Sequence, residues 1–241
     1  MKRNAKRALL TGLLLTALFA LWTFLIQTVD VRPVGQNGTD IGFAALNVWF
    51  HDLTDVHMWI YTITDWLGLV PIAVCMVFAV LGFVQLVKRR NLFRVDHDIL
   101  LLGLYYLLVI FGYLIFEMIP INYRPMLIEG FLEASYPSST TLLVLSVMPT
   151  LSFEAHRRLK RKALLYAADG FVTGFSLFMV IGRTVAGVHW LTDILGSVLL
   201  SGGLYLLWRG SVLLADEKQQ KTEEATWNST KNCRSCAKTA D

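Results

Sequence analysis

The chain has 241 residues, of which 55% are hydrophobic and 17% are charged, and its mean hydropathy is +0.52. Soluble globular domains carry about 25% charged residues, so this composition excludes that class and indicates an integral membrane protein. Disordered and collagen-like chains are excluded as well, and three cysteines are too few for a disulfide scaffold. The net charge of +4 does not indicate nucleic acid binding, because topology distributes the basic residues of a membrane protein.

Six apolar runs follow one another along the chain, each long enough or nearly long enough to cross a bilayer. They cover residues 8–29, 66–87, 99–116, 138–153, 163–182 and 190–208. Lipid offers no partner to unpaired backbone groups, and the runs are continuous rather than alternating, so helices are expected. We therefore predict an all-α integral membrane bundle of six transmembrane helices, formed by residues 1–210.

Basic residues lie almost entirely on one side of this predicted topology. With the N-terminus in the cytoplasm, 19 of the 22 Lys and Arg residues fall in cytoplasmic segments, and only Arg32, Arg124 and Arg183 face outside. The positive-inside rule therefore predicts a multi-pass plasma membrane protein with both termini cytoplasmic. Residues 30–65 then form an external loop with an interfacial amphipathic helix, and residues 211–241 form a polar, disordered cytoplasmic tail.

Three segments with unusual polar residues are expected at the outer ends of these helices. His189 and Asp193 are four residues apart, so on one helix face the carboxylate holds one imidazole nitrogen and leaves the other free as a nucleophile. Arg183 offers a fork of N–H groups that matches phosphate oxygens. Ser138 and Ser139 follow a proline at a helix start, where backbone N–H groups and hydroxyls bind anions. This pattern is typical of a phosphoryl-transfer site. The three segments are residues 117–125, 136–141 and 182–193.

The motifs resemble those of the type 2 phosphatidic acid phosphatase superfamily, the lipid phosphate phosphatases, over about residues 66–208. The resemblance implies a six-helix membrane enzyme that removes phosphate from lipid phosphates and diphosphates. The matching residues are Arg124-Pro125, Pro137-Ser138, and Arg183 with His189 and Asp193.

In that family the histidine of the third motif attacks phosphorus, the aspartate orients it, and the arginines and serine bind the phosphoryl oxygens. The resemblance therefore implies that His189 is the catalytic nucleophile and forms a phosphohistidine, with Asp193 as its catalytic partner. It also implies that the arginines and serines of the three motifs bind the phosphate. These phosphate-binding residues are Arg124, Arg183, Ser138 and Ser139.

The chain departs from the family pattern at two positions. The first motif usually begins with a lysine seven residues before the arginine, where this chain has Glu117. The second usually ends in Gly-His, whose histidine protonates the leaving group, where this chain has Ser139-Thr140. Loss of that acid affects an alkoxide leaving group most and a diphosphate least, because only the alkoxide needs the proton. Glu117 and Thr140 are thus candidates for a substitute acid or a headgroup contact.

Three functions fit this set of residues. The first is a hydrolase, a lipid phosphatase or diphosphatase acting on a phosphatidate-like or polyprenyl diphosphate substrate at the external face. The second is a lipid headgroup phosphotransferase related to the sphingomyelin synthases. The third is a catalytically inactive relative that binds a phospholipid. In each case the partners are a membrane lipid and the bilayer, and we expect no nucleic acid, cofactor or metal.

Overall fold

The structure is a computed structural model that describes residues 2–238, with side chains described for residues 3–227. The described residues are helical, with isolated β-bridges in the loops and no strand, which confirms the all-α class. Eight α-helices are present in this part of the chain. They are α1 (Lys2–Ile26), α2 (Ala44–Thr54), α3 (Met58–Leu67), α4 (Leu69–Arg89), α5 (His97–Met118), α6 (Ser139–Arg158), α7 (Lys162–Val185) and α8 (Leu191–Lys238).

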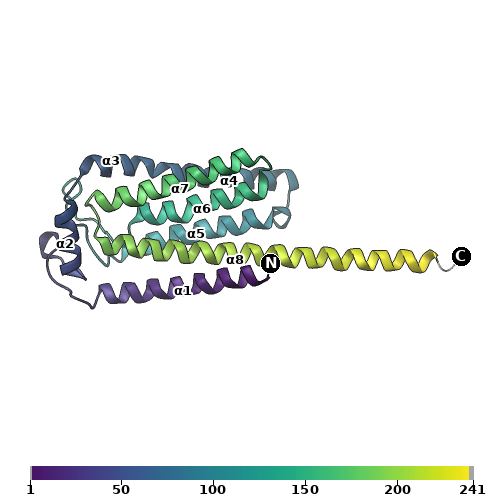
Figure 1. The fold of residues 1–241 in the computed structure, drawn as a ribbon, viewed down its shortest axis with the longest axis horizontal. Helices are drawn as coiled ribbons and strands as arrows, with labels where there is room; N and C mark the ends of the chain where they lie inside the picture. Colours follow the sequence, from purple (N-terminus) through teal and green to yellow (C-terminus); the bar gives the residue numbers. More distant parts are fainter. Residues whose placement is uncertain (1, 239–241) are drawn as a thin grey trace.

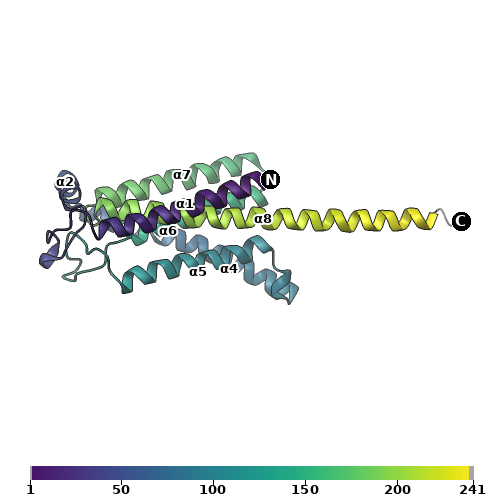
Figure 2. The same ribbon diagram turned by 90° about the horizontal axis from the view of Figure 1, so that it is seen from below.

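The long helices lie side by side in a bundle whose two ends differ (Figure 1). At one end, α2 lies across the bundle next to the connections of residues 119–138 and 186–190; we call this the site end. The N-terminus and the α4–α5 and α6–α7 connections lie at the opposite end (Figures 1 and 2). Helix α8 continues well beyond the bundle there.

Five segments are long and apolar enough to cross a membrane. They correspond to five of the six predicted runs, with α3 and α4 together forming the second. They are Arg3–Ile26, Met58–Arg89, His97–Met118, Lys162–Val185 and Leu191–Trp227.

The remaining predicted span, residues 138–153, lies in α6, which runs through the bundle but is too polar to count among the five. Its hydroxyl residues, such as Thr141, Ser146 and Thr150, are buried against neighbouring helices instead of facing outward. On its apolar side, Val144 and Met148 pack with residues of α7. The low hydropathy of α6 follows from this central position, because a helix enclosed by protein needs no apolar surface for lipid.

Helices α1 and α8 pack closely because glycines bring their backbones together. A Cβ atom added to Gly12 would lie 2.9 Å from the backbone nitrogen of Leu207, and one added to Gly203 would lie 2.6 Å from Oγ1 of Thr16. Small residues allow such close contacts between helices in lipid, where dispersion replaces the hydrophobic effect as the main attraction.

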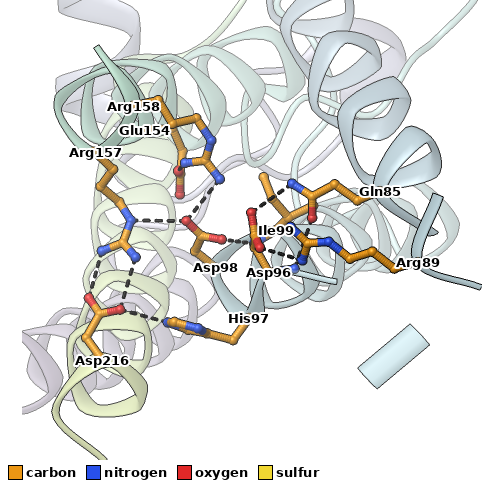
Figure 3. Close-up of polar contacts among 10 residues, drawn as sticks. All are labelled: Gln85, Arg89, Asp96, His97, Asp98, Ile99, Glu154, Arg157, Arg158 and Asp216. Atoms are coloured by element: carbon orange, nitrogen blue, oxygen red, sulfur yellow. Dashed lines mark hydrogen bonds and ion pairs between the residues drawn. The ribbon is translucent and has the colours of Figure 1, made fainter. Parts of the chain in front are cut away.

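Polar contacts join α5, α6 and α8 at the opposite end of the bundle (Figure 3). Asp98 of α5 accepts hydrogen bonds from Arg157 Nε at 3.1 Å and from Arg158 Nη2 at 3.0 Å. Arg157 also donates two hydrogen bonds to Asp216 of α8, at 2.7 and 3.0 Å, and His97 Nε2 lies 2.7 Å from the same carboxylate. These charges tie the end of the bundle to α8.

The structure differs from the sequence prediction at residue 211, where a disordered tail was expected and α8 instead continues to Lys238. Val212 is buried and Asp216 is paired with Arg157, so the first turns of this segment belong to the bundle. The side chains of residues 218–227 are exposed. Helix α8 remains part of the bundle beyond residue 211 because apolar residues that continue its buried face, such as Val212, pack against α5 and α6.

The predicted external loop, residues 30–65, also differs from the single interfacial helix expected there. It contains α2 and most of α3, and only Gly68 separates α3 from α4. The apolar run that begins at Met58 extends the second span toward the site end. Side chains of α3 therefore lie in the site described next.

Candidate active site

The turn between α7 and α8 places a histidine at the site end. Gly187 adopts a positive φ of 69°, and a Cβ atom there would lie 2.0 Å from the carbonyl oxygen of Asp55. Only glycine fits both conditions. The backbone N–H of His57 donates to the carbonyl of Ala186 at 3.0 Å, and Trp190 Nε1 donates to the carbonyl of Tyr123 at 2.7 Å. The turn is therefore held from two sides, with His189 inside it.

His189 is almost fully buried, with 4% of its surface exposed. Its Nδ1 lies 3.1 Å from the backbone carbonyl oxygen of Ser135, which can only accept, so the ring proton is assigned to Nδ1. Nε2 then carries the lone pair and lies 3.2 Å from Nη2 of Arg183. Burial, reinforced by the Arg183 and Arg124 guanidinium groups, holds the pKa of His189 well below its usual 6.5. The imidazole is therefore neutral, and its Nε2 lone pair faces the Arg183 guanidinium.

Asp193 does not hydrogen-bond His189 directly, in contrast to the contact that the four-residue spacing predicts. His189 precedes α8, and its Nδ1 lies 3.9 Å from Oδ2 of Asp193. Ser135 lies between them, because its Oγ donates to Asp193 Oδ2 and is 3.2 Å from His189 Nδ1. Asp193 also accepts from the backbone N–H of Trp190 at 2.9 Å and from Asn122 Nδ2 at 3.2 Å. Ser135 thus connects the aspartate to the imidazole.

Two arginines from different segments converge beside Nε2 of His189. Arg183 of α7 and Arg124 of the 119–138 connection are 1% and 8% exposed, and both guanidinium groups lie over the ring of Tyr61, at 4.9 and 5.7 Å. Arg183 Nη1 forms an ion pair of 3.6 Å with Asp65, and Arg124 Nε one of 3.1 Å with Glu133. Among the described residues, Arg124 Nη1 and Arg183 Nε have no acceptor. Buried, unpaired donors of this kind can bind the oxygens of an anion such as a phosphoryl group.

A polar pocket of about 240 Å³ opens onto His189 and Arg124, whereas Arg183 is not among the residues that line it. Of the residues predicted from the sequence, His189, Arg124, Ser139 and Glu117 line it. Ser138 does not, because it is fully buried and its Oγ donates to Thr141 Oγ1 at 3.1 Å.

A second, largely apolar cavity of about 530 Å³ lies between α4, α5 and α6. It shares Tyr113 and Ser139 with the polar pocket, so the two spaces adjoin. Thr140, which stands where the family's second-motif histidine would be, lines this apolar cavity, as does Asp65. The sequence prediction made Thr140 a candidate for a substitute acid or a headgroup contact, and the structure places it on the apolar side.

Several residues of the site were missed in the sequence, among them Ser135, Asn122, Tyr61 and Asp65. Ser135 and Asn122 lie within a few residues of the recognised motifs, and polar residues that close to a motif in an otherwise apolar chain were a usable signal. Tyr61 and Asp65 are four residues apart in a helix, which places both on one face of α3. That face was interpreted as interfacial, and no local signal connected it with Arg183.

Comparison with known proteins agrees with the motif resemblance. A sequence model of the PAP2 superfamily matches residues 113–214. The fold is similar to that of a solved structure, described as the first transmembrane PAP2 type phosphatidylglycerolphosphate phosphatase from Bacillus subtilis. The TM-score is 0.59 at 17% sequence identity, and the alignment covers 86% of this chain and 96% of the other. No curated protein sequence matches the chain.

Proposed function

From the premise that residues 113–214 place this chain in the PAP2 superfamily, we propose that it is a membrane lipid phosphatase or diphosphatase working through a phosphohistidine at His189. The observation that carries this proposal is the pair of buried, incompletely hydrogen-bonded guanidinium groups beside Nε2 of His189. A phosphate dianion there gains charge-assisted hydrogen bonds from both arginines.

The chemistry follows from the geometry in two steps. Nε2 of His189 attacks phosphorus, the P–N bond forms, and the bond to the leaving oxygen breaks. The imidazole ring gains positive charge, which the Ser135 carbonyl on Nδ1 and the nearby Asp193 carboxylate stabilise. Arg124 and Arg183 balance the charge on the phosphoryl oxygens. Water then attacks the phosphohistidine, releases inorganic phosphate and restores Nε2.

The adjoining apolar cavity supports a lipid as the substrate. Hydrocarbon from a phosphatidate-like or polyprenyl substrate fits the space that Leu69, Ile72 and Val109 line, with the phosphate in the polar pocket. We further propose six spans, with α6 as the sixth, cytoplasmic termini, and the site end at the external face of the plasma membrane, because the positive-inside rule places the basic opposite end in the cytoplasm.

The test is phosphate release from a short-chain phosphatidate and a polyprenyl diphosphate by the full chain in detergent. We expect release from at least one substrate, abolished in His189→Ala. A matched control is His97→Ala, since His97 lies at the opposite end of the bundle and contacts Asp216. Equal release by wild type and His189→Ala would refute the phosphohistidine mechanism.

A headgroup phosphotransferase is the second candidate, and two acidic residues favour it. Glu117 and Glu133 line the polar pocket together with Arg124. Carboxylates near a phosphate site suit a phosphodiester with a cationic amino-alcohol headgroup better than a dianionic monoester. Transfer of a labelled phosphocholine or phosphoethanolamine group to an acceptor lipid, without release of inorganic phosphate, would favour this function over hydrolysis.

A further inference from the structure

We infer that Asp65 of α3 protonates the leaving oxygen of the lipid, a role that rests on the proposed function. The second motif carries Thr140 where a histidine would supply this proton, so an alkoxide leaving group needs another donor. Helix α3 lies outside residues 113–214, the part of the chain that matches the family. The acid therefore comes from a different part of the chain.

The position of Asp65 relative to the nucleophile carries the first part of the argument. Asp65 Oδ1 lies 3.6 Å from Nη1 of Arg183, and Nη2 of the same guanidinium lies 3.2 Å from Nε2 of His189. One guanidinium group thus separates the carboxylate from the attacking nitrogen. In an in-line displacement the leaving oxygen is on the far side of phosphorus from the nucleophile.

The two adjoining spaces carry the second part. The leaving oxygen carries the hydrocarbon, so it is at the junction where the polar pocket meets the apolar cavity. Tyr113 and Ser139 line both spaces, and the polar side chains on the apolar side include Asp65 and Thr140. Glu117 lines only the polar pocket, which holds the phosphoryl oxygens. Asp65 is the carboxyl that shares a cavity with the leaving group.

Substrate binding also changes the charges that surround Asp65. When a phosphoryl group takes the N–H groups of Arg183, the carboxylate loses part of its ion pair and faces an anion. In the proposed step the proton of the Asp65 carboxyl passes to the bridging oxygen as the P–O bond breaks and its electron pair moves to that oxygen, giving the lipid alcohol and the Asp65 carboxylate. In the second step the carboxylate takes a proton from the attacking water, which restores the acid.

The experiment compares two leaving groups in pre-steady-state bursts of the full chain in detergent. Dioctanoyl phosphatidate releases an alkoxide, which needs a proton, whereas 4-nitrophenyl phosphate releases a stable phenolate, which does not. Asp65→Asn should lower the burst rate with the phosphatidate by about 10²- to 10⁴-fold and leave the nitrophenol burst nearly unchanged. The nitrophenol burst also shows that the variant is folded. Asp52→Asn is the matched control, because Asp52 is an exposed carboxylate of α2.

Equal loss with both substrates would overturn the proposal and assign Asp65 to positioning of Arg183, and no loss with either would overturn it as well. Thr140→His in the Asp65→Asn background supplies another donor in the same cavity and should restore the phosphatidate burst. A double variant with a normal nitrophenol burst and no such recovery would count against proton donation. Failure of the proposed function is a different result, in which wild type and His189→Ala give no burst with either substrate.

Discussion

Ser135 connects Asp193 to His189, the nucleophile of the proposed mechanism, so the Ser135 hydroxyl should matter for turnover even though it does not contact the phosphate in that mechanism. Ser135→Ala removes the hydrogen bond to the Asp193 carboxylate and the contact with His189 Nδ1, and leaves the backbone carbonyl in place. A hydrogen bond to a charged group contributes about 1.5–3 kcal/mol. If that stabilisation is needed in full at the transition state, kcat/KM falls by about 10- to 150-fold.

The assay is phosphate release from a short-chain phosphatidate, together with thermal unfolding in detergent. Ser146→Ala is the matched control, because the Ser146 hydroxyl is buried and has no hydrogen-bond partner among the described residues. It should leave kcat/KM unchanged. A Ser135→Ala variant that is as active as wild type while Asp193→Asn is inactive would refute the relay through Ser135 and would require a direct contact between Asp193 and His189.

Four further outcomes follow from the structure. Because the pKa of His189 lies well below 6.5, its neutral form persists in mild acid, and kcat/KM should stay constant as the pH falls through 6.5 until His189 itself is protonated; a loss centred at 6.5 in a pH profile would contradict this. The unfolded state binds this proton first, so thermal stability should fall as the pH drops below 6.5. Gly187→Ala should lower the free energy of unfolding by about 1–3 kcal/mol through its positive φ, measured by thermal unfolding against Gly170→Ala, where an added Cβ meets no atom within 4 Å. Arg124→Lys should raise the inhibition constant of inorganic phosphate, since lysine lacks the fork of donors, whereas an unchanged constant would remove Arg124 from the phosphate site.

The local signals of the sequence were strong enough to predict the long helices and to bring Arg124 and His189 to the same end of the bundle. Apolar runs of nearly bilayer length predict helices because lipid enforces backbone hydrogen bonding, and five of them appear as long apolar helices. Arg124 and His189 come together because each lies in a connection at the same end of the bundle. The local spacing of residues in the sequence was sufficient to predict these helices and these two positions.

Features that depend on tertiary contacts were missed. The spacing of His189 and Asp193 predicts a direct contact, but the turn before α8 holds the imidazole outside the helix, and Ser135 from a distant connection fills the gap. Asp65 is predicted as part of an external loop, and only the packing of α3 against α7 brings it to Arg183. Asp216 falls in a polar stretch that resembles a tail, because its partner Arg157 is 59 residues away.

The close contact between α1 and α8 has a consequence for how the protein is made. The ribosome synthesises α1 before α8. The surface of α1 around Gly12, which contacts α8 in the folded protein, therefore lacks this contact while the helices between them are inserted. The α1 residues Trp22 and Thr23 contact the site region directly, through the carbonyl of Thr192 at 3.1 Å and the hydroxyl of Tyr136 at 2.7 Å. The contact between Trp22 and Thr192 therefore forms only after α8 has been synthesised and has joined α1.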